Sequence, residues 1–213
     1  MVHKQSLKPR GRPRSYDPEK ALARATDAFW RTGYSATSLD DLSAATGMNR
    51  PSLYGAFGDK HALYLATLER YTADGRHVMD EALNSGQPLR EALKRVYDAA
   101  LSLYFPKKDV SRGCFLIGTA ATEAVRDSEI RVRLGAGLRE FDRAFEARLR
   151  YAKAQGELDA AADPAALAKI ASAVLHTLAL RSRAGDSRAS LRAIADVGVQ
   201  LICRTVPVKT RKA

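Results

Sequence analysis

The chain has 213 residues, with 35 lysines and arginines against 24 aspartates and glutamates, which gives a formal net charge of +11. This length allows one compact domain or two small ones, and only two cysteines are present, so a disulfide-stapled miniprotein is excluded. The excess of positive charge favours a polyanionic partner such as nucleic acid or an acidic membrane face.

Most of the excess charge lies at the two ends of the chain. Residues 1–16 hold five basic residues and residues 204–213 hold four, in both cases without an acid. We expect a basic, disordered N-terminal arm over 1–16 and a basic C-terminal tail over 206–213. The Gly-Arg-Pro-Arg core of the arm resembles an AT-hook, so Arg10, Arg12 and Arg14 are expected to enter an A·T-rich minor groove. The alternative is a solvated arm that only raises nonspecific affinity.

The sequence predicts neither a membrane-spanning segment nor a metal site. No stretch approaches the roughly 18 apolar residues of a membrane span, and no apolar run of signal-peptide type follows the first basic residues. Cys114 and Cys203 lack the CxxC spacing of a zinc site. The sequence predicts a cytoplasmic protein with no cofactor or metal and no membrane partner.

Helix signals begin immediately after the basic arm. Apolar residues recur at three- and four-residue spacing almost throughout, which predicts an all-α fold of about nine helices. The first helix is expected to start after Asp17, with Pro18 at its first position, and to end at Gly33. A Ser-x-x-Asp capping box at Ser38 opens a short second helix that closes at Gly47.

A third short helix follows the second after a tight turn. Asn49 caps it, Pro51 lies in its first turn and Gly58 ends it. Two short helices separated by a Gly-containing turn match the helix-turn-helix arrangement, and ordinary helical packing is the alternative for any single pair of this kind. We therefore predict a three-helix DNA-binding domain over residues 17–60.

The rest of the chain, residues 61–205, is predicted to form a second helical domain. An apolar run over 114–125 predicts a buried helix. Apolar residues from Ile130 to Leu149 step by three or four and fix one face of a long helix. Asp163 followed by proline opens a further helix, and a last helix follows the break at 184–187.

Candidate DNA-contacting residues lie on and around the third helix. Its outward side chains could reach base edges, and hydroxyl or ammonium groups at neighbouring helix starts could hold phosphates. Arg50 is the one long base reader, able to bond guanine O6 and N7 for about 1 to 3 kcal/mol of discrimination. Tyr54 could contact the DNA backbone or pack inward. The candidates are Thr37, Ser38, Arg50, Ser52, Tyr54 and Lys60.

These residues occur within a longer recognisable pattern. The segment Gly33 to Tyr71, GYSATSLDDLSAATGMNRPSLYGAFGDKHALYLATLERY, resembles the signature of the tetracycline-repressor (TetR) family of bacterial transcriptional regulators. The resemblance implies a repressor of double-stranded operator DNA. It also implies phosphate binding by Thr37, Ser38 and Lys60, and places Arg50, Ser52 and Tyr54 on the recognition helix.

The resemblance further implies a homodimer and an unknown small-molecule effector. Helix-turn-helix dimers bind half-sites about 34–36 Å apart or a larger helical repeat, so a second copy must be supplied by an apolar face. We expect that face on the last two helices, the alternative being that the same residues complete the core of one chain. The expected interface residues are Ala171, Val174, Leu175, Leu178, Ile194, Gly198, Leu201 and Ile202.

The effector is expected between the DNA-binding domain and the dimer face, in a pocket that is mostly apolar with a few polar groups. The same composition describes a filled helical core, and His176 on an apolar stripe is often a core histidine. The expected pocket residues are Tyr97, Leu101, Tyr104, Cys114, Phe115, Thr119, Thr122, Glu123, Phe141, Phe145 and His176.

Two other functions are compatible with the sequence, and a third is not. Cys114 follows Arg112 at a predicted helix start, where a cation and the helix dipole would lower its pKa, so a thiol sensor of oxidants or electrophiles is one alternative. A nonspecific architectural DNA-binding protein is another. An enzyme is not expected, because Cys114 and His176 are the only pair that could supply a nucleophile and a base, and no phosphate loop, zinc spacing or dinucleotide fingerprint is present.

Overall fold

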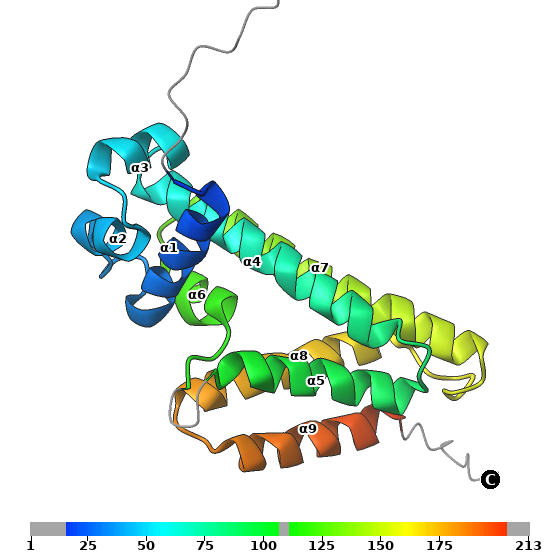
Figure 1. Ribbon diagram of the computed structural model, residues 1–213. Coiled ribbons are helices and arrows are strands. Elements are labelled where there is room, and N and C mark those ends of the chain that lie inside the picture. The colour runs from blue at the N-terminus through cyan, green and yellow to red at the C-terminus, as the bar shows by residue number, and fades with distance from the viewer. Residues whose placement is uncertain (1–15, 107–110, 204–213) are drawn as a thin grey trace, which may run out of the picture.

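The computed structural model describes residues 16–106 and 111–203. Within those ranges it has nine α-helices and one π-helical turn, η1, and no strand (Figure 1), so the predicted all-α class is confirmed. The N-terminal arm with Arg10, Arg12 and Arg14, and the C-terminal tail, lie outside the described residues. The elements are α1 (Pro18–Thr32), α2 (Leu39–Thr46), α3 (Arg50–Phe57), α4 (Lys60–Leu83), α5 (Leu89–Tyr104), η1 (Leu116–Ala120), α6 (Ala121–Glu123), α7 (Ser128–Ala154), α8 (Pro164–Arg183) and α9 (Arg188–Cys203).

The first four helices begin where the capping residues of the sequence place them. Asp17, Asn49 and Asp59 each accept a hydrogen bond from a backbone N–H of the first turn of the next helix. Ser38 and Asp41 form the reciprocal bonds of a capping box at the start of α2. Because these caps satisfy otherwise unpaired donors, the helix starts are fixed locally and could be predicted from the sequence.

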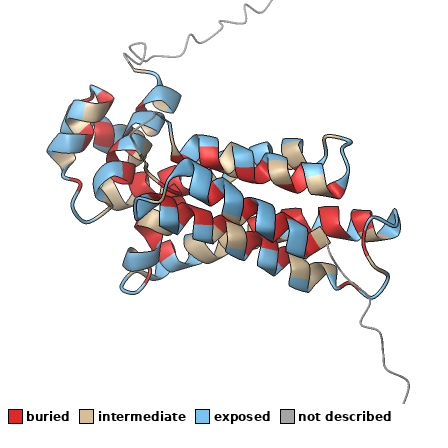
Figure 2. Ribbon diagram, turned by 90° about the horizontal axis from the view of Figure 1, so that it is seen from below, coloured by how far each residue is buried: buried red, intermediate tan, exposed pale blue. Residues whose placement is uncertain are grey.

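Helices α1 to α3 form a small unit at one end of the molecule, which we call the head, and α4 to α9 form the body (Figure 1). The head closes around Phe29, Leu42 and Leu53, each at most 3% exposed. In the body, α4 and α7 run side by side as a long pair, while α5, α8 and α9 pack beside them (Figure 1). Figure 2 shows buried residues gathered where helices face one another and exposed residues on the outer faces.

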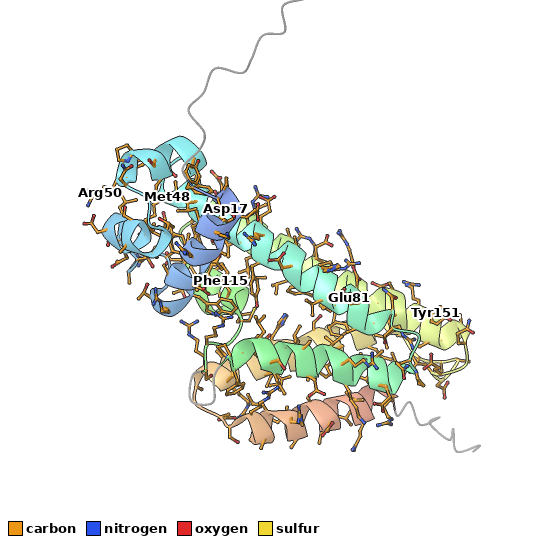
Figure 3. All side chains as sticks on the ribbon, in the orientation of Figure 1. Asp17, Met48, Arg50, Glu81, Phe115 and Tyr151 are labelled. Carbon is orange, nitrogen blue, oxygen red and sulfur yellow. The ribbon has the colours of Figure 1, made fainter. Side chains whose placement is uncertain are left out.

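Aromatic side chains join the head to the body. Phe115 is fully buried, and its ring centroid lies 5.5 Å from that of Trp30 on α1 and 5.5 Å from that of Tyr71 on α4. Figure 3 shows Phe115 at the junction of the two units. The buried helix predicted over 114–125 is present as one continuous helical segment, in which the π-helical turn η1 leads directly into the three residues of α6. This short segment therefore contacts the head from the body side.

None of the helices in the described ranges is long and apolar enough to cross a lipid bilayer.

Candidate nucleic-acid interface and internal cavity

The recognition-helix candidate α3 presents one buried and one exposed side. Leu53 is buried against the head, whereas Arg50, Ser52 and Tyr54 are exposed. Asn49 Oδ1 accepts a hydrogen bond from Ser52 N at 2.9 Å, which fixes the first turn. Tyr54 is 47% exposed, so the alternative that it packs in the core is wrong. Figure 3 shows Arg50 at the outer end of the head, away from the body.

Arg50 is not alone at this surface. Its Nε and Nη2 both donate to Oδ1 of Asp40, at 3.0 and 2.7 Å. Asp40 lies in the first turn of α2, so the pair joins the two helices of the helix-turn-helix unit. This hydrogen bonding raises the pKa of Arg50, which stays charged. Sequence reasoning missed Asp40, because an acid in a first helical turn is expected there for the helix dipole alone.

The two hydroxyl candidates at the start of α2 behave differently. Thr37 is only 1% exposed, and its Oγ1 donates to Gly33 O at 2.6 Å, so the expectation that it holds a phosphate is wrong. Its hydroxyl closes the end of α1 instead. Ser38 is exposed; its Oγ accepts from Asp41 N at 3.1 Å and donates to Asp41 Oδ2 at 2.7 Å. These bonds lower the pKa of Asp41.

Lys60 is the first residue of α4, where the helix dipole favours an anion. Its Nζ lies 4.6 Å from the centroid of the Tyr34 ring, a cation–π contact that holds the half-buried side chain near the head surface. Burial lowers the pKa of Lys60, while Glu123 and Asp41 oppose the shift. Its role as a phosphate ligand remains a prediction.

A cavity of about 500 Å³, partly open to solvent, lies between the head and the body. Helices α1, α4, α5, α7 and α8 contribute to its wall together with η1, so residues far apart in the sequence meet there. Its walls are mostly apolar and include Trp30, Tyr71 and Leu103. The predicted residues that line it are Tyr104, Cys114, Phe141 and His176.

The other predicted pocket residues lie elsewhere, in two groups. Tyr97, Leu101, Phe115, Thr119 and Phe145 are buried in the core outside the wall of this cavity. Tyr97, for example, donates through its hydroxyl to Ala171 O at 3.1 Å.

The second group is on the surface and at the head–body contact. Thr122 is exposed, and Glu123 Oε1 accepts a hydrogen bond from Ser35 Oγ of the head at 2.7 Å. Neither lines the cavity. Trp30 and Tyr71, which do line it, were missed because their distance from Tyr104 is set only by the packing of the helices.

The loop before η1 binds directly to α1. The Arg112 guanidinium lies 3.8 Å from the centroid of the Trp30 ring, and its Nη1 is 3.0 Å from Oδ1 of Asp27. Trp30 Nε1 in turn donates to Arg112 O at 3.1 Å. Since Trp30 and Asp27 also line the cavity, these contacts connect the cavity wall to the head.

Two cavity residues carry polar atoms of interest. Among the described residues, Nε2 of His176 has no hydrogen-bond partner although it is shielded from solvent. Burial lowers the pKa of His176, against an opposing effect of Asp142, so its ring is neutral at neutral pH. His176 lies in the cavity wall, and pairing of this nitrogen with a bound molecule requires the side chains that cover it to move.

Cys114 does not have the environment expected for an activated thiol. It is buried, and its Sγ accepts a hydrogen bond from the Tyr71 hydroxyl at 3.2 Å. Burial raises the pKa of the thiol, and this outweighs the neighbouring hydrogen bonds that lower it. The expectation of a lowered pKa is therefore wrong, because burial of the thiol outweighs the backbone N–H groups of Leu116 and Ile117, which lower the pKa.

Most of the predicted dimer residues are already covered within one chain. Ala171, Leu175, Leu178, Gly198 and Ile202 are buried, so their assignment to a dimer face was wrong and the core alternative describes them. A Cβ on Gly198 would lie 2.8 Å from Val174, which shows how closely α8 and α9 approach. Val174 and Ile194 are half-buried, and Leu201 is exposed. The exposed large aliphatic residues on these two helices are Ile170, Leu180, Val197 and Leu201.

Comparison with known proteins gives consistent matches over both units. The model described as "Bacterial regulatory proteins, tetR family" matches residues 21–67, and "Tetracyclin repressor-like, C-terminal domain" matches 88–197. The HTH-type transcriptional repressor ComR of Escherichia coli is 32% identical over 194 residues, which cover 91% of this chain and 92% of ComR.

Solved structures agree with these matches. A cysteine mutant of the TetR family transcriptional regulator CifR, complexed with 26 bp double-strand operator DNA, is 31% identical with a TM-score of 0.76. The match covers 89% of this chain and 98% of that one. Reduced NemR of E. coli, at 21% identity, has the same fold with a TM-score of 0.76 and coverage of 85% and 94%.

Proposed function

Since this chain belongs to the tetR family of bacterial regulatory proteins, we propose that it represses transcription as a homodimer on an inverted-repeat operator and is released by a small molecule. DNA binding and transcriptional repression follow from the family, and the chain is not an enzyme. The dimer, the symmetry of the operator and the effector are the proposal. The observation that carries it is the exposed face of α3, with Arg50 at the outer end of the head.

We place α3 in the major groove of the operator. Its eight residues suit a groove about 12 Å wide, and Leu53 anchors its inner side while Arg50, Ser52 and Tyr54 face outward. Ser38 at the start of α2 and Lys60 at the start of α4 flank this face and would hold phosphates of the backbone. In this arrangement the flanking contacts set the position of the head, and Arg50 supplies the base reading.

A second copy is expected to pack on the outer faces of α8 and α9. Ile170, Leu180, Val197 and Leu201 are between 50% and 65% exposed in the single chain. Exposed aliphatic residues at helical spacing on neighbouring helices are typical of a self-complementary interface. This face lies on the body, away from α3 (Figure 1), so two copies would present both recognition helices to one duplex.

The cavity is the proposed effector site. Its volume of about 500 Å³ is in the usual range for small-molecule sites, and its walls are mostly apolar. Trp30 and Tyr71 offer aromatic surfaces, and His176 Nε2 offers one unpaired polar atom. The effector is therefore proposed to be a mainly apolar molecule with a polar group that hydrogen-bonds to neutral His176.

Effector binding would act on the head through α1. A molecule in the cavity touches Trp30 directly and so competes with the contacts between Trp30 and Arg112. A ligand shifts a conformational equilibrium only by its difference in affinity for the two states, typically about 1 to 3 kcal/mol. The expected result is a change in the spacing or orientation of the two heads that lowers operator affinity.

Selection of duplexes from a random pool tests this proposal. The full-length protein should recover an inverted repeat bound by two chains, with half-site centres about 34–36 Å apart or a larger helical repeat. An A·T-rich flank would support minor-groove binding by Arg10, Arg12 and Arg14. Arg50→Ala should abolish selection with folding intact.

The matched control for this substitution is Arg192→Ala. Arg192 pairs with Asp98 through Nε and Nη2 at 3.1 and 2.7 Å, as Arg50 pairs with Asp40, but it lies on the body. Its loss should leave the selected sequence unchanged. Recovery of unrelated sequences, or of a site bound by a single chain, would contradict the proposal.

A further inference from the structure

The ion pair between Arg50 and Asp40 lies on the face proposed to enter the groove. Arg50 is the first residue of α3 and Asp40 lies in the first turn of α2, and their side chains are 54% and 76% exposed. Exposed ion pairs contribute little to folding stability, with a typical value of about 0–1 kcal/mol. A contribution to the stability of the head therefore does not explain the ion pair. The position of the pair on the exposed face of α3 points to a role in DNA binding.

The geometry of the pair leaves a defined set of donors for DNA. A guanidinium has five N–H groups, and the two bonds to Asp40 Oδ1 use the Nε–H and one Nη2–H. The second Nη2–H and one Nη1–H are left side by side on the outer edge of Arg50, and the other Nη1–H points back towards Cδ. A pair of parallel donors on that edge matches the O6 and N7 acceptors of guanine in the major groove.

We propose that Asp40 is a specificity-determining residue that holds the Arg50 guanidinium by its Nε side, so that the Nη1–Nη2 edge reads guanine. The proposal rests on the placement of α3 in the major groove. Asp40 acts through Arg50 and is a positioning residue, with no contact of its own to the base required.

The same carboxylate acts against binding to other sequences. Arg50 could otherwise swing to a phosphate, which carries no sequence information. Asp40 competes for the guanidinium and offsets its charge, and it repels the phosphates of any duplex. Asp40 thus raises the ratio of operator affinity to random-DNA affinity, both by favouring guanine and by weakening nonspecific attraction.

The test uses the full-length protein and the inverted repeat recovered from the random pool. Three duplexes of equal length are titrated: the operator, the operator with the half-site guanine replaced by 7-deazaguanine, which lacks N7, and a random duplex. The protein variants are wild type, Asp40→Asn, Arg50→Lys and the double variant. Asp98→Asn is the matched control, since it removes the carboxylate charge from the Arg192–Asp98 pair of the same geometry on the body.

Loss of N7 should cost the wild type about tenfold in affinity, the lower range for one bidentate contact. For Asp40→Asn, the affinity lost with 7-deazaguanine should shrink to about threefold or less. This variant should also bind the random duplex more tightly than the wild type does. Asp98→Asn should behave as wild type. In the Arg50→Lys background Asp40→Asn should not change the 7-deazaguanine effect, because lysine has no planar fork to orient.

One result would overturn the inference while leaving the proposed function standing. If Asp40→Asn tightens binding to the operator and the random duplex by the same factor, and the 7-deazaguanine effect stays as in wild type, Asp40 is only a repulsive charge. If no inverted repeat is recovered at all, it is the proposed function that fails. Thermal melting of each variant, and Asp40→Glu as a second variant that keeps the carboxylate, separate these outcomes from loss of folding.

Discussion

The head and the cavity region are built by different means. In the head, Asp17, Ser38 and Asn49 each cap a helix through a backbone N–H no more than three residues away. The cavity wall comes from five α-helices and η1, and its residues span positions 23 to 176. The head is thus specified by local hydrogen bonds, whereas the cavity exists only after the body has packed.

Under the proposed function, this difference lets one chain keep a fixed recognition surface while the proposed effector acts on the head. Short capped helices hold Arg50 and Asp40 in place through contacts within the head. The cavity meets the head at α1 through Trp30 and Asp27, which are held by Arg112 of the loop before η1. A ligand can therefore move the head as a unit without dismantling its reading face.

The largest effect is expected from removing the aromatic centre of the junction. Phe115→Ala deletes a fully buried ring that packs on Trp30, Tyr64 and Tyr71, and should lower the free energy of unfolding by about 3–5 kcal/mol. Urea denaturation measures this change. Val125→Ala, at a residue 75% exposed, is the control and should change stability by less than about 0.5 kcal/mol. A loss below about 1 kcal/mol for Phe115→Ala would show that packing does not hold this region.

Removing a head cap should cost less. Ser38→Ala deletes the hydroxyl that accepts from Asp41 N, at a cost of about 1 kcal/mol. Because α2 supports α3, operator affinity should fall as well. Ser38→Thr keeps the acceptor and should restore most of both losses. If Ser38→Ala leaves the melting temperature unchanged, local capping is not what fixes the head.

Breaking the link between cavity and head should have a smaller effect on stability. Arg112→Ala removes the stacking on Trp30 and the ion pair to Asp27, worth about 0.5–1 kcal/mol because the guanidinium is partly exposed. Fluorescence of Trp30, the single tryptophan of the chain, reports the change in its surroundings. Arg112→Lys keeps the charge but not the planar group, and should give an intermediate emission. Emission identical to wild type in both variants would contradict the link.

The smallest change in stability is expected from lowering the pH, through protonation of His176 in the cavity wall. Burial lowers the folded pKa of His176 below its ordinary value of 6.5, so between these two pKa values the unfolded chain binds a proton that the folded chain does not. Stability should therefore fall as the pH drops below about 6.5, and less so for His176→Gln. The exposed His77, changed to Gln, is the control and should retain the wild-type slope. Equal slopes for His176→Gln and wild type would contradict the burial of a neutral ring.

The sequence predicts the head better than the cavity for a physical reason. Caps act over two or three residues, so the pattern around Asp17, Ser38 and Asn49 is visible in the chain itself. The pairing of Asp40 with Arg50 depends on how α2 crosses α3, and no spacing rule gives it.

In the body, the sequence does not determine which residues are buried and which line the cavity. Both faces of α8 are apolar, with Leu175 buried and Ile170 exposed, so periodicity predicts the helix but not which face meets the core. Trp30 and Tyr104 meet at the cavity only because α1 and α5 both pack against α4. The burial of Cys114 is likewise a tertiary effect, and it reverses the pKa shift expected from its neighbours in sequence.

The most direct test of the account follows Trp30 emission and operator affinity together while mainly apolar compounds with one hydrogen-bonding group are titrated. A compound that changes Trp30 emission occupies the cavity and should lower affinity for the selected inverted repeat by about 5- to 150-fold, the usual range of coupling between two sites. His176→Phe should weaken its binding. Saturation of the Trp30 signal with unchanged operator affinity would contradict the claim that the cavity controls the head.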